Sequence, residues 1–196
     1  MFPPSNSPSD ALIPGLRYHP ALISEVEEHA LVTALSNLPL KPFEFHGHLG
    51  NRRTASFGLR YDYARGGLQL ADSPPRFLDA LLLKVAEFAG RALDDFRQVG
   101  INEYRPGAGI GWHRDKPEFG DVVGVSLVST VKMRFRRRSG KGWTRASQIL
   151  EPRSVYLLTG ESRKLWEHSI APVPSLRYSL TFRTLVAGEV TLLNTA

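Results

Sequence analysis

The alternation of apolar and polar residues predicts two helices followed by a series of short strands. Residues 21–38 repeat apolar residues near helical spacing, with Ser24 as the predicted N-cap and acidic residues in the first turn. A second, longer helix is predicted to open at Ser73-Pro74-Pro75 and to carry its apolar stripe as far as Phe96. We expect this second helix to pack on a sheet.

Beyond residue 99 the pattern changes to short strands separated by Gly, Pro and Ser turns. Helices followed by a run of strands predict an α+β fold, with the strands forming an antiparallel barrel or a jelly roll. Residues 43–65 combine short strands, Gly turns, aromatic residues and arginines, and we interpret them as a surface lid. We interpret His46 and His48 as lid residues and not as a second metal site, because no carboxylate matches this pair.

Composition limits the chain to one soluble domain. Its 196 residues, 42% of them hydrophobic, are enough for a single core. Residues 1–15 are rich in Pro and Ser and predict a flexible arm, which leaves 16–196 as the domain. The first residues lack a secretory signal, and no apolar run reaches the roughly 20 residues of a membrane span. We therefore expect a cytoplasmic monomer without a membrane partner.

Charge and cysteine content narrow the chemistry. The 25 Lys and Arg exceed the 19 Asp and Glu, and the resulting charge of +6 favours an acidic partner such as nucleic acid. The absence of cysteine excludes a disulfide scaffold, a Cys-ligated zinc site and a thiol nucleophile. Any metal must be bound by nitrogen and oxygen ligands.

A candidate metal motif lies in the segment Gly111-Trp112-His113-Arg114-Asp115. Side chains alternate along a strand, so His113 and Asp115 project to the same face and can share one metal ion. His168 lies in a separate predicted strand. Two imidazoles and one carboxylate are the facial triad of non-haem Fe(II) oxygenases, although a His two residues from an Asp is also common as a surface hydrogen-bonded pair.

The segment Arg177–Arg183 alternates polar and apolar residues. An ordinary half-exposed strand would place Arg177 and Arg183 in water. If the strand instead lines a barrel interior, both arginines need anionic partners, which a dicarboxylate ligand would supply. Asn102 and Tyr104 share a strand face just before the metal motif, where they are either carboxylate-binding groups or core residues.

Together, these motifs resemble the AlkB family of Fe(II)- and 2-oxoglutarate-dependent dioxygenases over roughly residues 40–186. They are N-x-Y-x-P-G at 102–107, H-x-D at 113–115, G-E-S-R at 160–163 before His168, and R-Y-S-L-T-F-R at 177–183. The resemblance implies a double-stranded β-helix core over about 99–186, with N-terminal supporting helices and a β-hairpin substrate lid. It also implies Fe(II) bound by His113, Asp115 and His168.

Further roles follow from the same resemblance. Arg177 would clamp the far carboxylate of 2-oxoglutarate with Asn102, Tyr104 and Ser179, while Arg183 would lie nearer the iron-bound end. The implied activity is O2-dependent oxidative demethylation of N-alkylated bases in DNA or RNA, releasing formaldehyde, succinate and CO2. The side chains expected to face the nucleic acid are Arg52, Arg53, Phe57, Tyr61 and Arg163.

Two features leave the substrate open. Repair members of the family typically carry an acidic base-contacting residue where this chain has Pro117, and Glu118 is a possible substitute. The densest basic cluster, around Arg134, Arg136 and Arg138, fits either a phosphate-binding hairpin or a solvated tip. The alternatives are the same chemistry on a modified tRNA nucleoside or a protein side chain, and a jelly roll that binds nucleic acid without turnover.

Overall fold

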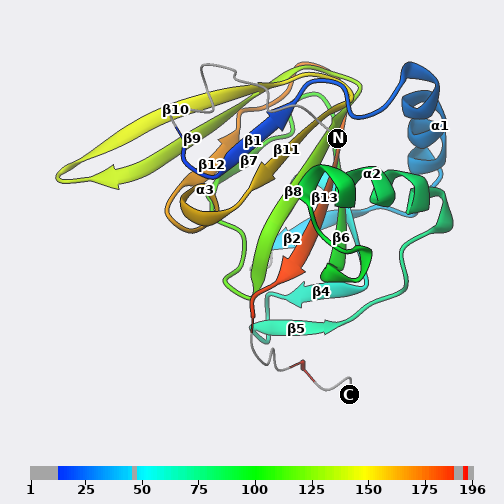
Figure 1. Cartoon of the computed structure of the whole chain (residues 1–196), viewed down its shortest axis with the longest axis horizontal. Coiled ribbons are helices and arrows are strands. Elements are labelled where there is room, and N and C mark those ends of the chain that lie inside the picture. The colour runs from blue at the N-terminus through cyan, green and yellow to red at the C-terminus, as the bar shows by residue number, and fades with distance from the viewer. Residues whose placement is uncertain (1–12, 46–47, 188–191, 194–196) are drawn as a thin grey trace.

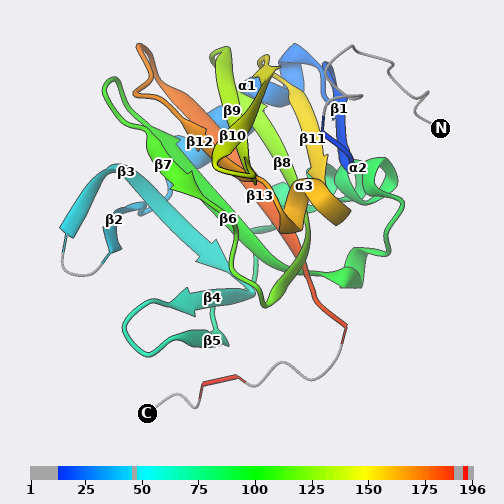
Figure 2. The ribbon, with the colours of Figure 1, turned by 90° about the vertical axis from the view of Figure 1, so that its left-hand side faces the viewer.

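The computed structural model describes residues 13–45, 48–187 and 192–193. Two antiparallel sheets face each other, and the helices α1 and α2 cover the outer face of the larger one (Figures 1 and 2). The predicted α+β class with a jelly-roll core is therefore confirmed. No helix of the described residues is long and apolar enough to cross a membrane.

The large sheet has seven strands and the small sheet has four. The large sheet runs in the order β1 (Leu16–His19), β11 (Ser154–Leu158), β8 (Phe119–Leu127), β13 (Arg177–Leu185), β6 (Phe96–Tyr104), β3 (His48–Phe57), β2 (Lys41–Phe45). The small sheet runs in the order β10 (Gly142–Leu150), β9 (Val131–Ser139), β12 (Glu167–Ile170), β7 (Ile110–His113). A separate hairpin pairs β4 (Leu59–Asp62) with β5 (Gly67–Leu70).

Capping residues mark where α1 begins and where α2 ends. The first, α1 (Glu25–Ser36), starts at the predicted N-cap Ser24, which forms a capping box with Glu27. The second, α2 (Asp79–Ala89), follows a 3-10 turn and ends at Gly90, whose φ of +67° is a left-handed cap. Our prediction that this helix continues to Phe96 is wrong, because Phe96 begins β6. A third, short helix is α3 (Gly160–Lys164).

The boundaries predicted at the N-terminal half also need correction. Residues 1–12 of the predicted arm lie outside the described residues, but Ile13 is fully buried in the core, so the domain begins before residue 16. The predicted lid is not a separate flap throughout, because Arg53–Phe57 of β3 pair with β6 in the large sheet. His46 and the side chain of His48 lie outside the described residues.

Strand alternation gives the large sheet two different faces. Tyr178, Leu180 and Phe182 of β13 pack toward the helices in the main core, while Ser179, Thr181 and Arg183 line a cavity between the two sheets. The polar face of this strand is thus enclosed rather than exposed to water. This arrangement places the sequence motifs around one internal space.

A buried ionic cluster closes the helix-side face of the large sheet. Glu103 accepts hydrogen bonds from Arg53 at 2.8 and 2.6 Å, from Arg105 at 2.8 Å and from the Tyr178 hydroxyl at 3.1 Å. These bonds, led by that from Arg53, lower the pKa of Glu103. Its ionised form therefore stabilises the fold above the ordinary carboxyl pKa of about 4.3, and the stabilisation is lost as the pH falls through the lower folded-state value.

We expect Glu103→Gln to lower the free energy of unfolding at pH 7 by about 2 kcal/mol, because the buried carboxylate loses its charge-assisted hydrogen bonds with Arg53 and Arg105. As the pH is lowered, the free energy of unfolding of this variant should also decrease less than that of the native protein. Urea unfolding from pH 3 to pH 7 measures both effects. Glu161→Gln, which disrupts the exposed pair with Arg137, is the control and should change stability by less than about 1 kcal/mol. Equal effects of the two substitutions would contradict the structural role of Glu103.

Candidate active site

The two sheets enclose a cavity of about 560 Å³ that is lined by residues from both of them. Its floor includes Asn102, Tyr104 and Ser179 from the large sheet, and its other wall includes His113 and His168 from the small sheet. Strand pairing explains this convergence, since Asn102 lies opposite Ser179 and Tyr104 lies opposite Arg177. The motifs that are far apart in the sequence therefore meet at one site.

The three candidate metal ligands lie together at the edge of the small sheet. His113 on β7 is registered directly opposite His168 on β12, and their ring centroids are 4.3 Å apart. The Nε2 atom of His168 lies 3.7 Å from Oδ2 of Asp115, which follows β7 in the chain. As the side chains are placed, no three His, Cys, Asp or Glu residues in the described part of the chain are arranged so that they could hold a metal ion.

The protonation states of the three groups suit a cation. Burial, followed by the proximity of His113, lowers the pKa of His168 to about 3. Burial also lowers the pKa of His113, so both imidazoles are neutral near pH 7 and keep a lone pair for a metal. Burial alone would raise the pKa of Asp115, but Arg183 and the two histidines outweigh it and the net shift is downward. The set is thus two neutral nitrogens and one carboxylate, the donors expected of a non-haem iron site.

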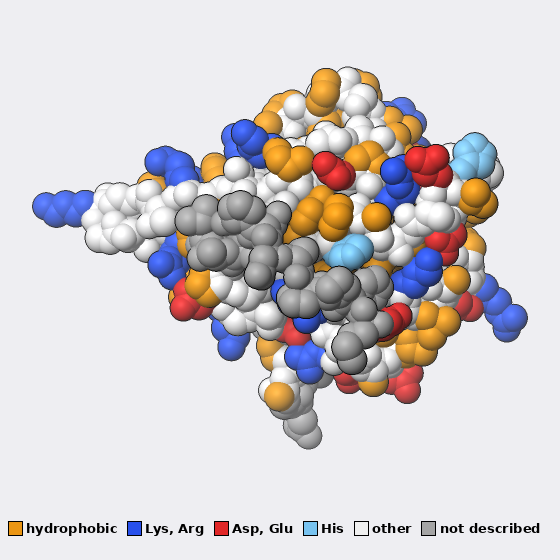
Figure 3. Space-filling view, turned by 45° about the horizontal axis from the view of Figure 1, so that its top comes forward, with side chains coloured by type: hydrophobic (Ala, Val, Ile, Leu, Met, Phe, Trp, Pro, Cys, Tyr) orange, Lys and Arg blue, Asp and Glu red, His pale blue; other side chains and the backbone are white. Residues whose placement is uncertain are grey.

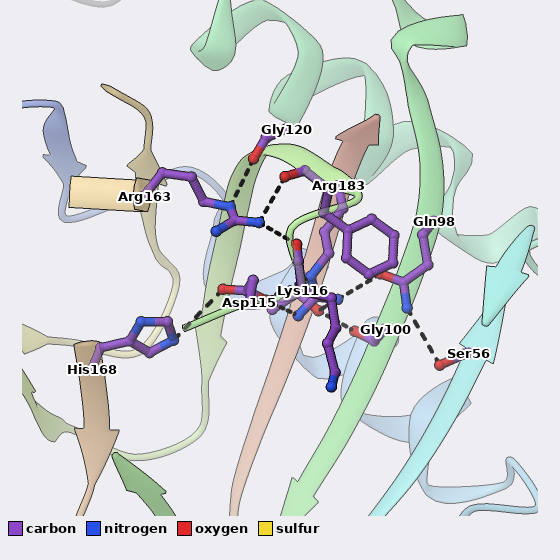
Figure 4. A network of polar contacts seen from close by, with 11 residues as sticks. Ser56, Gln98, Gly100, Asp115, Lys116, Gly120, Arg163, His168 and Arg183 are labelled. Atoms are coloured by element: carbon purple, nitrogen blue, oxygen red, sulfur yellow. Dashed lines mark hydrogen bonds and ion pairs between the residues drawn. The ribbon is translucent and has the colours of Figure 1, made fainter. Parts of the chain in front are cut away.

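Arg183 lies beside the candidate ligands and orients Asp115. Its Nε and Nη2 atoms lie 2.8 and 2.7 Å from Oδ1 of Asp115, and its Nη1 donates to Gln98 at 2.5 Å and to Thr181 at 2.9 Å (Figure 4). The other carboxylate oxygen, Oδ2, is left facing His168. Arg183 therefore lies beside the candidate metal ligands.

Arg177 is fully buried, and it has no anionic partner among the residues that the structure describes. Its Nε donates to Ser126 at 3.0 Å, and its guanidinium lies 5.2 Å from the centroid of the Tyr104 ring. Among the described residues, neither Nη1 nor Nη2 has a hydrogen-bond partner. Burial lowers the pKa of Arg177, although the nearby Tyr104 and Tyr156 act in the opposite direction. A buried guanidinium with two unused donors fits a ligand carboxylate, which would supply the missing charge and hydrogen bonds.

The cavity mouth carries aromatic rings and cations from the predicted lid. Arg52 and Tyr61, which we expected on the substrate side, line the cavity together with Tyr63 and Lys116. The Nζ atom of Lys116 lies 4.3 and 4.8 Å from the ring centroids of Tyr61 and Tyr63. Lys116 meets Tyr61 and Tyr63 because β4 packs against the loop after Asp115. No local sequence pattern predicts this packing.

Two predicted substrate-side residues point away from the cavity. Arg53 is on the opposite face of β3 from Arg52 and pairs with the buried Glu103. Phe57 packs against the main hydrophobic core and lies opposite Val99. Both predictions are corrected by the same fact, which is that β3 is an internal strand of the large sheet whose odd-numbered side chains face the helices.

Arg163 also has a different place from the one predicted. It is buried, and it donates to the backbone carbonyls of Gly120 at 2.8 Å, Lys116 at 2.5 Å and Phe119 at 2.6 Å (Figure 4). Its Nε and Nη2 atoms thus hold the loop that follows Asp115 instead of facing a substrate. Pro117 is exposed on this loop, and Glu118 is not among the cavity-lining residues.

We expect Arg163→Met to weaken metal binding by about 10- to 100-fold, because the loop that positions Asp115 loses three hydrogen bonds. Titration of the protein with Co²⁺, followed by the visible spectrum, measures this affinity directly. The adjacent Lys164→Met is the control, since the Lys164 side chain is exposed. Unchanged Co²⁺ affinity in Arg163→Met would show that the loop holds its position without the arginine.

Comparisons with known proteins agree with this geometry. The model of the 2OG-Fe(II) oxygenase superfamily matches residues 18–183. The chain is 32% identical over 171 residues to the mouse (Mus musculus) tRNA (carboxymethyluridine(34)-5-O)-methyltransferase ALKBH8, covering 83% of this chain and 25% of the mouse protein. It is 29% identical over 189 residues to the Arabidopsis thaliana alkylated DNA repair protein ALKBH8 homolog, covering 83% of this chain and 52% of that one. The chain thus spans about a quarter to a half of the length of these relatives.

Solved structures show the same fold. The structure of OsALKBH1 superposes with a TM-score of 0.61 at 16% identity, covering 87% of this chain and 97% of that chain. An oxidoreductase of the 2OG-Fe(II) oxygenase family from Burkholderia pseudomallei gives a TM-score of 0.59 at 17% identity, covering 87% of this chain and 85% of that chain. The chain belongs to the 2OG-Fe(II) oxygenase superfamily, in its AlkB-like branch.

Proposed function

We propose that the protein is an Fe(II)- and 2-oxoglutarate-dependent dioxygenase that oxidatively demethylates N-alkylated bases in nucleic acid. The products would be formaldehyde, succinate and CO2. The observation that carries the proposal is the buried Arg177, whose Nη1 and Nη2 atoms have no hydrogen-bond partner among the described residues. Its guanidinium lies 5.2 Å from the ring of Tyr104, which lines the cavity that His113, Asp115 and His168 also line. An unpaired buried charge destabilises a protein, and a carboxylate of a bound dicarboxylate would pair with the Arg177 guanidinium and remove that cost.

The chain's residues have separable roles in this chemistry. Iron would be held by the two imidazoles and by Asp115, and with 2-oxoglutarate and O2 it supplies the oxidising power. Arg177 binds the far carboxylate of 2-oxoglutarate, with the polar groups of Asn102, Tyr104 and Ser179 on the neighbouring cavity floor. Arg183 orients Asp115. The two sheets around the cavity limit the access of water, and a base rotated out of a strand would enter beside Tyr61, which lines the cavity.

A nucleic-acid partner is supported by how charge is distributed. The hairpin of β9 and β10, residues 131–150, contains seven Lys and Arg and no Asp or Glu, whereas the remaining 18 Lys and Arg are outnumbered by the 19 Asp and Glu. The hairpin projects from the body of the molecule, and Lys and Arg side chains stand out along it (Figures 1 and 3). The whole positive excess of the chain is therefore concentrated on one projecting element, which suits a phosphate backbone.

A ladder of arginines and tryptophans connects the cavity to this hairpin. Trp112, which lines the cavity, lies 4.5 Å from the Arg136 guanidinium, and that guanidinium lies 4.2 Å from the Trp143 ring. Arg138 continues the ladder at 4.7 Å from Trp143. Stacking restricts the guanidinium groups of Arg136 and Arg138, and Arg136 is held further by Glu167, to which its Nε donates at 2.6 Å. Arginines that are fixed in this way can meet phosphates at a lower entropic cost.

We expect Arg138→Gln combined with Arg145→Gln to weaken binding of a single-stranded oligonucleotide and to reduce the slope of log affinity against log salt by roughly 1 to 1.5. Fluorescence anisotropy at several salt concentrations measures both quantities. Arg76→Gln with Arg97→Gln is the matched control, because these two arginines are exposed outside the hairpin. Equal slopes in the two double variants would contradict the assignment of the hairpin to phosphates.

A modified tRNA nucleoside is the second candidate substrate. It is favoured by the mouse relative, whose name refers to a carboxymethyluridine of tRNA. Mass spectrometry after incubation with iron, ascorbate and 2-oxoglutarate, using methylated DNA and RNA oligonucleotides and bulk tRNA, separates the candidates. Loss of a methylene mass from an N-methylated base supports demethylation, whereas gain of one oxygen on a tRNA nucleoside supports the second candidate. No change in any nucleic acid would overturn both.

A further inference from the structure

The cavity mouth has the form of an aromatic box. Phe43, Tyr61 and Tyr63 all line the cavity, with ring centroids 5.5 Å apart for Phe43 and Tyr63 and 5.1 Å apart for Tyr61 and Tyr63. Both pairs meet edge to face. Rings grouped in this way attract cations through their faces, and such a box would suit a positively charged base if those faces were open.

The faces are already taken by cations of the chain itself. The Arg52 guanidinium lies 3.9 Å from the centroid of Phe43, and Lys116 lies over both tyrosines. The backbone of Lys116 is held in place by Arg163, while its side chain extends away from that contact (Figure 4). The box is therefore occupied by two fixed positive charges on the substrate side of the metal ligands.

No carboxylate in the cavity offsets these charges for a ligand. Asp115 is the one acidic residue among the described residues that line it, and its Oδ1 is held by Arg183. The Nε atom of Arg52 is buried without a hydrogen-bond partner in the described structure. The mouth thus offers an unused donor and a net positive charge.

We propose that Arg52 and Lys116 select bases that are uncharged or carry an acidic substituent, and that they disfavour bases with a fixed positive charge. The inference rests on the proposed function and names the substrate class of the same site. A carboxylate on the base would be attracted by the Lys116 ammonium and by the charge of the Arg52 guanidinium, whereas a cationic ring would be repelled by both and would find the aromatic faces occupied.

Two pairs of oligonucleotides test the effect of the charge of the base. One pair carries 1-methyladenine, which is cationic, or N6-methyladenine, which is neutral. The other carries 5-carboxymethyluridine, which is anionic, or its neutral amide. Affinities are measured by anisotropy with protein loaded with Mn²⁺ and N-oxalylglycine, so that no turnover occurs. We expect the less positive member of each pair to bind about fivefold more tightly or better.

Charge reversal at the mouth should change this preference. Lys116→Glu is expected to reduce or invert both ratios, Lys116→Arg to retain them, and Arg76→Glu, a charge reversal at an exposed site outside the cavity, to leave them unchanged. Equal affinities within each pair for the native protein, or ratios unaffected by Lys116→Glu, would overturn the charge selection while leaving the proposed function standing. Absence of binding to all four oligonucleotides would overturn the proposed function and this inference together.

Discussion

Replacing His113 by alanine is expected to reduce 2-oxoglutarate turnover by roughly a thousandfold or more, equivalent to about 4 kcal/mol of activation free energy. The substitution removes one of two neutral imidazoles at the metal site, and the remaining pair of His168 and Asp115 does not complete a facial set. Succinate release with iron and ascorbate measures the loss.

The same substitution should leave the fold intact. The His113 side chain forms a hydrogen bond between Nδ1 and the Gly111 carbonyl at 2.9 Å, and the loss of this bond costs about 1 kcal/mol. Circular dichroism and a thermal melt check this. His29→Ala, at an exposed position of α1, is the control and should retain full turnover. Substantial turnover by the His113 variant would remove this residue from the metal site.

The second large effect is expected at Arg177. Arg177→Met should raise the KM for 2-oxoglutarate by about a hundredfold, because truncating one partner of a buried charge pair costs about 2–5 kcal/mol. Binding by isothermal titration should weaken in parallel. Arg177→Lys keeps the charge but loses the planar two-donor fork, so it should restore only part of the affinity.

The same variant should make the ligand-free protein more stable. Its native arginine is fully buried with two unpaired nitrogens, and replacing a buried charge by an apolar side chain stabilises by about 1–4 kcal/mol. Loss of the hydrogen bond to Ser126 offsets about 1 kcal/mol of this gain. A thermal melt should therefore show a higher Tm without 2-oxoglutarate and little further rise with it. A lower Tm with an unchanged KM would contradict a ligand-binding role.

The sequence alone predicts the parts of the site that depend on strand alternation. The i, i+2 spacing of His113 and Asp115 and the alternation around Arg177 specify which side chains share a face, and the structure encloses that face. The assignment of individual roles still came from the resemblance to a family. From the alternation by itself, a half-exposed strand with its arginines in water is the commoner outcome.

The errors arise where the outcome depends on tertiary register. Arg52 and Arg53 are adjacent and chemically alike, and their separation into cavity and ionic cluster requires knowing that β3 pairs with β6. Arg163 looks like a surface turn residue until the carbonyls of the loop after Asp115 are seen to surround it. The position of Lys116 in the cavity likewise depends on its contacts with two tyrosines that lie more than fifty residues earlier in the chain.

The most direct test of the proposed function is the ratio of succinate formed to base altered. The protein is incubated with iron, 2-oxoglutarate, O2 and each nucleic acid of the panel, and succinate, formaldehyde and the modified base are quantified in the same reaction. The account predicts that one substrate raises succinate release above the rate without nucleic acid, with one formaldehyde and one demethylated base per additional succinate. Succinate release that no nucleic acid increases, with every base unchanged in mass, would contradict it.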